Sequence, residues 1–346
     1  MTEQKFFKLS NIFEIKTSKC IHENGLKQGA GTIPYVTRTS LNNGVSKFVC
    51  SQGTEKLNPG NVITVGMDTQ TVFYQKQNFY CGRDILSLSN TIMNQYIGIF
   101  VVGVLDQVVK KKYSYGYCAS LTRIKNLEIK LPSTSDGNPN WEFMESYIRE
   151  QYREVVQKRI DELEKKKPDA PTVLRDIEEI QATADFPLGQ VFPTITRGIQ
   201  ISKRNRKPGT LPYISASLLN HGEADFVSVD EKYIYKDCLT VPFIGGENCT
   251  FYHDGEFVPS ANVIILKNEN LDKFMYTFLI GIINIIMTRF NYGYVASLER
   301  LQKQTIPLPI TSDGKPDWEF MSDYIKTQFQ IVFEEELKRL KSKLDE

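Results

Sequence analysis

The sequence is poor in the residues that build metal and nucleophilic sites. Its 346 residues include only three histidines, His22, His221 and His253, so no zinc site is predicted. These histidines have no partners in the sequence pattern, and we expect them on the surface or in loops. The cysteines form no C-x-x-C pair, which fits reduced thiols in a cytoplasm. The six are Cys20, Cys50, Cys81, Cys118, Cys238 and Cys249.

The chain also lacks a strong net charge and a long hydrophobic run. Its 42 lysines and arginines balance 41 aspartates and glutamates, so composition alone indicates no nucleic-acid or membrane partner. An electrostatic site must therefore be a local cluster. The longest apolar run, Phe274–Met287, is shorter than the ~20 residues that a membrane span needs, and it predicts a buried core helix. The polar start, Met1–Phe7, does not resemble a signal peptide, so we expect a cytoplasmic protein.

Recognisable catalytic motifs are missing as well. The sequence has no Walker A loop, no G-x-S-x-G, no H-E-x-x-H, and no aromatic tetrad or Gly-rich loop of the kind that amino-methyltransferases carry. Glu164–Lys166 and Glu336–Lys338 have the E-x-K shape of some nuclease sites. Both lie in charged helical stretches, where a solvated helix face is the favoured interpretation. We therefore predict no catalytic residue and no metal ligand.

What the chain does contain is a duplication. Residues 134–148 match residues 311–325 at eleven of fifteen positions, including a shared Asp-Gly-x-Pro-x-Trp-Glu-Phe-Met block. The only two tryptophans, Trp141 and Trp318, lie in this block. Gly31–Tyr35 reappears as Gly209–Tyr213 and Tyr115–Tyr117 as Tyr292–Tyr294, so the repeat covers a unit of roughly 150 residues. A solenoid would need a shorter period repeated more often.

Each unit predicts an α+β domain with a small curved sheet and a few helices. Short segments rich in Val, Ile, Phe and Tyr, bounded by Gly, Asn and Asp, indicate strands. In the first unit they are Ile33–Val36, Lys47–Cys50, Asn61–Val65 and Thr71–Tyr74. Their counterparts are Leu211–Ser215, Ala224–Ser228, Leu239–Phe243 and Cys249–Tyr252. Apolar helical segments follow at 92–109 and 271–289.

A long amphipathic helix is predicted behind each unit. Apolar residues recur every three or four positions, which is typical of a helix that packs along one face. They are Met144, Ile148, Tyr152, Val156, Ile160 and Leu163 in the first copy, and Met321, Ile325, Phe329, Phe333, Leu337 and Leu340 in the second. About 27 residues would give a rod of ~40 Å. Because duplicated units usually pack about a pseudo-two-fold axis, we expect the helices to pair as an antiparallel coiled coil.

These elements divide the chain into five parts. A first recognition domain is predicted at 1–140 and its spacer helix at 141–167. A charged linker follows at 168–185, with a short helix near 173–181. The second recognition domain is predicted at 186–317 and its helix at 318–346. Trp141 and Trp318 are expected to wedge each domain against the base of its helix.

Local clusters of cations and aromatic side chains indicate DNA contact. Cations beside aromatic residues and glycine suit phosphate contact combined with base or sugar packing. The clusters are Lys110, Lys111, Lys112, Tyr113, Tyr115 and Tyr117 in the first unit, and Lys203, Arg204, Arg206, Lys207, Arg289, Tyr292 and Tyr294 in the second. The alternative is that the tyrosines are core residues and the lysines only solubilise the chain.

Polar side chains just past each Pro-Tyr pair suit the reading of base edges. They are Thr37, Arg38, Thr39, Ser40 and Asn42 in the first unit, and Ser215, Ser217 and Asn220 in the second. Ordinary turn chemistry is the alternative, and Asn42-Asn43-Gly44 is typical of it.

Taken together, the order of these pieces resembles the specificity (S) subunits of type I restriction-modification systems, or of related bipartite systems. The resemblance covers almost the whole chain. It rests on the two Gly-Tyr segments, the Leu131-Pro132 and Leu308-Pro309 pairs, both Trp-containing blocks and the helix behind each domain. It implies that each domain reads one half of a split site in double-stranded DNA. It also implies that the helices set the spacing and dock two methyltransferase (M) subunits, with restriction (R) subunits as possible further partners.

The same resemblance implies adenine methylation with S-adenosylmethionine bound by the M subunits, and no cofactor in this chain. The ~40 Å rod agrees with it, since one DNA turn measures ~34–36 Å. We therefore expect a non-catalytic DNA-recognition subunit. Two rivals remain at this point: an enzyme whose site has no recognisable motif, and a coiled-coil scaffold without a DNA role.

Overall fold

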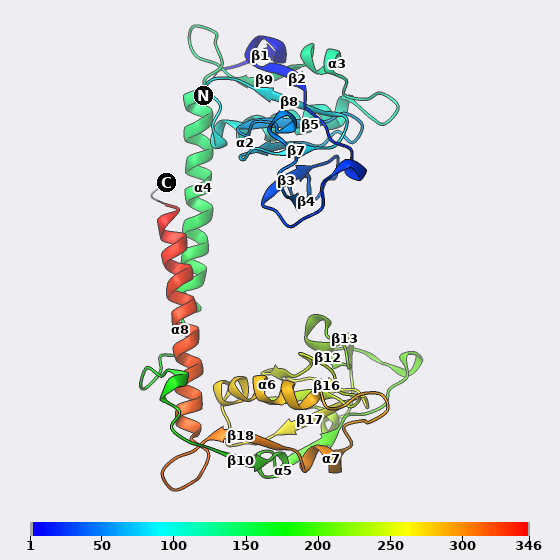
Figure 1. Ribbon diagram of the computed structural model, residues 1–346, viewed down its shortest axis with the longest axis vertical. Coiled ribbons are helices and arrows are strands. Elements are labelled where there is room, and N and C mark those ends of the chain that lie inside the picture. Colours follow the sequence, from blue (N-terminus) through cyan, green and yellow to red (C-terminus); the bar gives the residue numbers. More distant parts are fainter. Residues whose placement is uncertain (1–2, 345–346) are drawn as a thin grey trace. The chain divides into compact units, whose positions relative to one another are not determined.

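The computed structural model describes residues 3–344, and the chain divides into two compact units, Met1–Arg159 and Ile160–Glu346 (Figure 1). The first unit contains β1 Gln4–Lys8, α1 Leu9–Ile12, β2 Glu14–Thr17, β3 Ile33–Val36, β4 Val45–Val49, β5 Val62–Gly66, β6 Val72–Gln75, β7 Tyr80–Cys81, β8 Ile85–Ser89, α2 Gln95–Lys112, α3 Leu121–Lys125 and β9 Glu128–Pro132. Helix α4, Trp141–Glu164, runs across the boundary.

The second unit repeats this order. It contains β10 Thr183–Pro187, α5 Leu188–Val191, β11 Thr194–Arg197, β12 Pro208–Ile214, β13 Glu223–Val227, β14 Cys238–Pro242, β15 Phe251–His253, β16 Val258–Pro259, β17 Val263–Lys267, α6 Lys273–Met287, α7 Leu298–Gln302, β18 Thr305–Pro309 and α8 Trp318–Ser342. Within residues 3–344, no helix is long and apolar enough to span a membrane, and no group of His, Cys, Asp or Glu is arranged to hold a metal ion.

Both units hold the same three sheets, which confirms the predicted duplication and the α+β class. In the first unit the sheets have the strand orders β2-β8-β5-β6, β4-β3-β7 and β1-β9. In the second they are β11-β17-β14-β15, β13-β12-β16 and β10-β18. All pairs are antiparallel except β3 with β7 and β12 with β16. The central register is also repeated, with Ile63 opposite Leu88 and Leu239 opposite Leu266.

The core of each unit lies between its four-stranded sheet and its long internal helix. In the first unit Ile63 and Leu88 from the sheet meet Val101 and Leu105 from α2, and all four are fully buried. Leu239, Leu266, Leu279 and Ile283 form the corresponding core of the second unit. Each such side chain contributes about 1.5–3 kcal/mol when it leaves water, so this packing fixes the loops at the sheet ends.

The two internal helices begin later than the apolar pattern predicts, because a polar side chain caps the start of each. The Asn94 side chain accepts hydrogen bonds from the backbone N–H groups of Tyr96 and Ile97, both at 3.0 Å. Asp272 caps α6 in the same way, at 2.8 Å from two N–H groups. The predicted start at Ile92 is therefore wrong, because a capping side chain ends the extended backbone at the cap.

The duplicated Trp-containing block forms the same joint in both units. Gly137 and Gly314 adopt left-handed φ angles of 80° and 77°, which favour glycine in a tight turn. The residue three positions after each glycine caps the long helix, since Asn140 accepts from Phe143 N at 3.0 Å and Asp317 from Phe320 N at 2.9 Å.

The residues that follow the cap anchor the helix in its own domain. Met144 and Met321 are fully buried, and Trp141 and Trp318 pack against the two cores. The predicted wedge between each domain and its helix is therefore present. The start of each long helix is fixed by its own domain.

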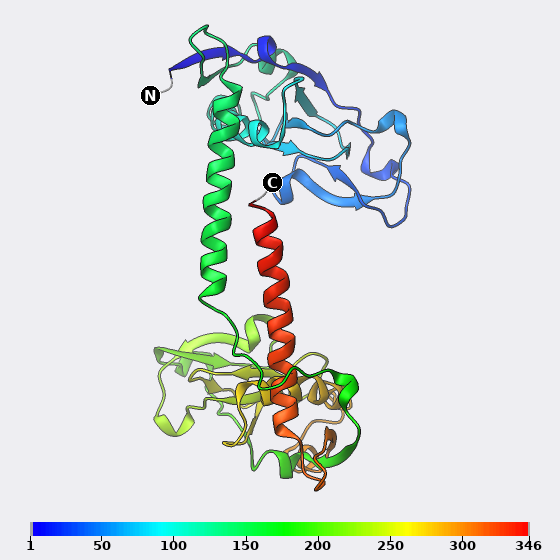
Figure 2. The ribbon, with the colours of Figure 1, turned by 90° about the vertical axis from the view of Figure 1, so that its left-hand side faces the viewer.

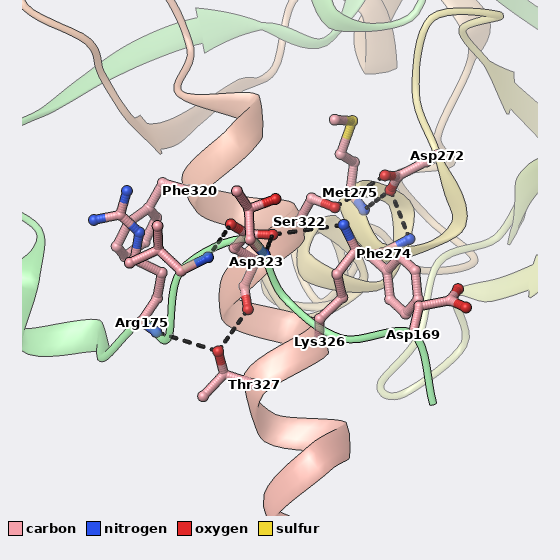
Figure 3. A network of polar contacts seen from close by, with 12 residues as sticks. Asp169, Arg175, Asp272, Phe274, Met275, Phe320, Ser322, Asp323, Lys326 and Thr327 are labelled. Atoms are coloured by element: carbon pink, nitrogen blue, oxygen red, sulfur yellow. Dashed lines mark hydrogen bonds and ion pairs between the residues drawn. The ribbon is translucent and has the colours of Figure 1, made fainter. Parts of the chain in front are cut away.

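In the second unit, the chain that leads into β10 is bound to α8. We call residues 169–179 the strap, and Figure 2 shows this segment, drawn in green, crossing the helix. The Asp323 carboxylate accepts from the N–H groups of Thr172 and Val173, both at 3.0 Å (Figure 3). Arg175 N donates to Thr327 Oγ1 at 3.2 Å. The strap is therefore a fixed element of the second unit.

Asp323 is the centre of this network, with an exposed fraction of only 1%. Burial alone would raise the pKa of its carboxyl, but the N–H groups of Thr172 and Val173 and the Lys326 ammonium hold the pKa below its usual value. Lys273 Nζ lies 3.0 Å from the Asp169 carboxylate and ties the strap to the start of α6.

Three further predictions need correction. The short helix expected at 173–181 is a single 3-10 turn, Ile177–Glu179, because the N–H groups before it bond to α8 side chains. Residues 183–185, assigned to the linker, belong to β10 and pair with β18. His253 lies within β15, with Nε2 2.8 Å from Thr240 Oγ1, and burial lowers its pKa to about 4. It is therefore a neutral packing residue.

Candidate nucleic-acid interface

A tyrosine at the tip of a tight turn projects from each unit. Backbone hydrogen bonds close the turn between Ser114 and Tyr117 at 3.0 and 3.1 Å, and between Asn291 and Tyr294 at 3.0 Å. Tyr115 is 88% exposed and Tyr292 is 90% exposed. A large aromatic side chain held clear of the surface at the same place in both units suits contact with a partner.

The second tyrosine of each turn instead stacks on neighbouring side chains of its own unit, an arrangement that we call the tyrosine clamp. Tyr117 stacks on Tyr113 with ring centroids 5.8 Å apart, and the Arg123 guanidinium lies over the Tyr117 ring, 3.7 Å from its centroid. The Arg123 Nη1 also donates to the Cys118 carbonyl at 2.8 Å. The second unit repeats these contacts: the Phe290 and Tyr294 ring centroids are 5.7 Å apart, and the Arg300 guanidinium lies 4.4 Å from the Tyr294 centroid. Tyr113 is buried, and we remove it from the predicted DNA contacts.

In the first unit, the predicted base-reading residues meet the exposed tyrosine at one cleft. This cleft of 520 Å³ is lined by Thr37, Arg38 and Thr39 from the loop after β3, and by Tyr115 from the turn after α2. Two segments about 75 residues apart in the sequence are thus brought together. Arg83, which precedes β8, also lines the cleft, is exposed, and has no ion-pair partner among the described residues.

A cleft of 130 Å³ occupies the corresponding place in the second unit. Ser215 and Ser217 line it from the loop after β12, together with Ala216 between them. Its other wall is the loop after β14, which includes Ile244. That loop lies next to the Tyr292 turn, since Gly246 N donates to Met287 O at 3.2 Å.

Asn42 and Asn220 shape the turn behind these residues. Both adopt left-handed φ angles, 48° and 47°, as the turn-chemistry alternative predicted. Thr39 Oγ1 and Ser217 Oγ each accept a backbone N–H two residues further on, at 3.2 and 3.1 Å. Ser40 remains exposed in the first unit.

The basic loop of the second unit divides into two kinds of cation. Lys203, Arg204 and Lys207 are exposed. Arg206 is engaged within the fold, because its Nη1 lies 2.9 Å from the Asp225 carboxylate and its guanidinium lies over Tyr213. The hydrogen bond from Arg206 holds the pKa of Asp225 below its usual value. The charge of Arg206 is therefore already balanced by Asp225.

The remaining predicted cations lie next to the tyrosine turns. Lys110, Lys111 and Lys112 form the last turn of α2, where their positive charge complements the helix dipole. Lys110 Nζ is 2.8 Å from the Asp106 carboxylate. In the second unit the Arg289 guanidinium donates to Gln304 Oε1 at 3.1 Å.

Asp68 and Arg83 line the first cleft and were not predicted, and neither was Asp84, which contacts Arg38 beside the cleft. Asp68 and Asp84 both contact the Arg38 guanidinium, the latter at 3.2 Å. A signal for them was present in the duplication, because Arg83 and Asp84 stand where the second copy has Ala261 and Asn262. The two copies therefore differ in charge at this place.

The apolar positions of the two long helices have mixed surroundings. Met144 and Met321 pack within their own domains, and Phe329 contacts Phe274 edge to face, with ring centroids 6.0 Å apart. The pairing role of the others stays a prediction. They are Ile148, Tyr152, Val156, Ile160, Leu163, Ile325, Phe333, Leu337 and Leu340.

Comparison with known proteins agrees with this architecture. Residues 1–165 and 182–341 match the model of the type I restriction modification DNA specificity domain. The specificity subunit S.BcgI of a type II restriction enzyme from Heyndrickxia coagulans is 28% identical over 324 residues, which is 92% of this chain and 92% of that protein.

The fold is that of a solved S subunit. The S subunit of a type I restriction-modification system from M. genitalium superposes with a TM-score of 0.54 at 14% identity, covering 99% of this chain and 92% of that chain. The HsdS subunit from Thermoanaerobacter tengcongensis has a TM-score of 0.38 at 12% identity, with 98% and 91% covered.

The chain belongs to the family of type I restriction modification DNA specificity domains, of which it holds two copies. Its role is DNA sequence recognition within a restriction-modification complex. Specificity subunits are not catalytic, and the chemistry resides in the partner methyltransferase and restriction subunits.

Proposed function

We propose that each unit reads one half of a bipartite, asymmetric site in double-stranded DNA. The observation that carries this proposal is the repeated pairing of an exposed tyrosine with a cleft whose lining differs between the units. Tyr115 lines a cleft with two arginines, whereas Ser215 and Ser217 line a small one beside the Tyr292 turn. Two similar scaffolds with different side chains should prefer different base sequences.

We further propose that cations around the clefts supply the phosphate contacts. Lys111, Lys112 and Arg289 are exposed beside the tyrosine turns, and Lys203 and Lys207 are exposed in the basic loop. Each phosphate contact releases counterions, so binding should weaken steeply as salt is added. The net charge of +1 offers no other source of such a dependence.

The long helices are proposed to pair antiparallel, to set the gap between the half-sites and to dock two M subunits. S-adenosylmethionine would bind to those subunits, R subunits could join the same complex, and the assembly would work in the cytoplasm on cellular DNA. Inserting seven residues into α4 should change the gap or abolish binding while each half-site keeps its sequence. A changed half-site with an unchanged gap would contradict this role.

The experiment that tests the function uses the chain together with the methyltransferase that copurifies with it. Footprinting and mapping of methylated bases should show two unlike half-sites separated by a fixed gap. Binding should fall with salt. A single contiguous site or a perfect palindrome would contradict the proposal, and salt-independent binding would favour a scaffold without a DNA role.

A further inference from the structure

The two clefts occupy the same place in the two units, as their backbone contacts show. Met67, directly after β5, donates its N–H to the Asp84 carbonyl at 2.9 Å. Phe243, directly after β14, donates to the Asn262 carbonyl at 2.8 Å. Each of these residues also accepts the N–H of an alanine at 2.8 Å, Ala119 in the first unit and its counterpart in the second. The side chains around each cleft can therefore be compared position by position.

Arg38 is held in the first cleft by two carboxylates. Its Nη1 contacts Asp68 and lies 3.2 Å from Asp84 Oδ2. Its Nε and Nη2 groups donate to no other residue in the described part of the chain. About a third of the side chain, 35%, is exposed. The Nη1 group is thus fixed by the protein, and the edge formed by Nε and Nη2 is available.

The second unit lacks every member of this triad. Ala216 stands at the position of Arg38, and Asn262 at that of Asp84. Ile244, one residue past Phe243, stands at that of Asp68. The replacements remove the one cation and both carboxylates together, so the triad belongs to the first unit alone and is not needed for the fold that both units share.

The surroundings of Arg38 suit a nucleic-acid base. Thr37 and Thr39 flank it, and Arg83 lines the same cleft and offsets the negative charge that Asp68 and Asp84 would present to phosphate. Glu23 also lines the cleft, and its carboxylate is paired with the Lys47 ammonium. Tyr115 stands at the rim. In the major groove, a guanidinium with two N–H groups on one edge matches the O6 and N7 acceptors of guanine.

We propose that Arg38 reads a guanine in the half-site of the first unit, with Asp68 and Asp84 as positioning residues that orient its fork. The inference rests on the proposed function, and it names the base for one of the two clefts. The second unit reads its half-site without a guanidinium at this position. Two carboxylates on Nη1 reduce the freedom of the side chain, so less conformational entropy is lost when the base is bound.

The test measures base discrimination in the intact complex with its methyltransferase. Methylation rates are compared on duplexes in which each pair of both half-sites is changed in turn. In the wild type, replacing the critical G·C pair should cost roughly 5- to 150-fold. Arg38→Ala should bring this ratio close to one and leave every ratio in the other half-site unchanged. Arg38→Lys keeps the charge without the fork and should also lose most of the discrimination.

Asp68→Asn combined with Asp84→Asn should reduce discrimination at the same pair only. Lys203→Ala is the matched control, since it removes an exposed cation from the other unit and should weaken all sequences equally. Unfolding curves of each variant show whether the fold is retained, and the double Asn variant stays informative if Arg38→Ala unfolds.

Two results would overturn the inference. One is undiminished discrimination by a folded Arg38→Ala variant, which would make the triad a structural ion-pair network. The other is a half-site of A·T pairs alone wherever Arg38→Ala has its effect. A wild-type complex that selects no split target would instead sink the proposed function itself, so the two failures are distinguishable.

Discussion

The two units share one topology and one joint, and they differ where function should differ. Strand order, helix caps and the stacked tyrosine clamp are repeated. The residues that line the clefts differ. Where the first unit has Arg38 and its two carboxylates, the second has Ala216, Ile244 and Asn262. After duplication the scaffold was kept while the reading surface changed, as two unlike half-sites would require.

A second difference lies at the start of the long helices. In the second unit Asp323 and Thr327 are buried under the strap. The corresponding residues of α4, Ser146 and Glu150, are exposed. Asn94 donates to Glu145 in the first unit, and Ser322 donates to Asp272 in the second, at 2.8 and 2.9 Å. The same contact is thus made with donor and acceptor exchanged.

The largest effect is expected from the shared joint. Trp141→Ala and Trp318→Ala should each destabilise their own unit by about 3 kcal/mol, because each removes a large, half-buried aromatic side chain that packs against the core. Chemical unfolding measures this. Both variants should also loosen the gap between half-sites in target mapping. Half-site errors with normal spacing would place the block on the DNA-reading surface instead.

The next largest loss of stability is expected from breaking the contacts of the strap, and it should be confined to the second unit. Asp323→Ala removes a carboxylate that accepts two backbone N–H groups, with an expected loss of about 2 kcal/mol in the free energy of unfolding. Ser146→Ala, the matched change on α4, should be close to neutral. Since the folded pKa of Asp323 is lowered, its contribution is present above about pH 4 and is lost as the pH falls further. Equal losses in both variants would contradict the comparison.

The stability of the two units should depend differently on pH, because one buried side chain differs between them. Gln75 Nε2 lies 3.2 Å from Thr64 Oγ1, and His253 takes the place of Gln75 beside Thr240. Burial, helped by the nearby His221, lowers the pKa of His253 to about 4.

The unfolded state therefore binds a proton that the folded state does not. The free energy of unfolding of the second unit should therefore decrease by roughly 1.4 kcal/mol for each pH unit as the pH is lowered from about 6.5 to about 4. His253→Gln should flatten this slope, measured by unfolding at a series of pH values. Gln75→His should introduce a slope in the first unit. An unchanged slope in His253→Gln would show that another group titrates.

The smallest effect concerns phosphate contact. Lys203→Ala and Lys207→Ala should each reduce the slope of log affinity against log salt by about one. Arg206→Ala is the control, because its charge is balanced by Asp225 and should affect stability more than the slope. Equal slope changes in all three variants would mean that the ion pair opens on DNA.

Much of this molecule was predictable from sequence because duplication makes the pattern visible twice. The strand segment at Ile33–Val36 is β3, and the joint glycines and tryptophans behave as expected. The start of α2 was misplaced because Ile92 continues the apolar pattern although it lies outside the helix and is exposed. A single capping asparagine outweighed it.

The candidate site was predicted only in part. The chemistry of Thr37, Arg38 and Tyr115 predicts contact with DNA, and these residues do meet at one cleft. Asp68 and Asp84 could not be found that way, since they join Arg38 only through the pairing of β5 with β8. The strap was missed because its N–H groups are bound by side chains about 150 residues away.

The central claim is that each unit independently specifies one half-site. A chimaera in which residues 4–140 replace residues 183–317 carries two copies of the first unit, and its methylated target can be mapped directly. We predict a symmetric target, with the half-site of the first unit repeated in inverted orientation across the gap. Retention of the original asymmetric target would contradict the account.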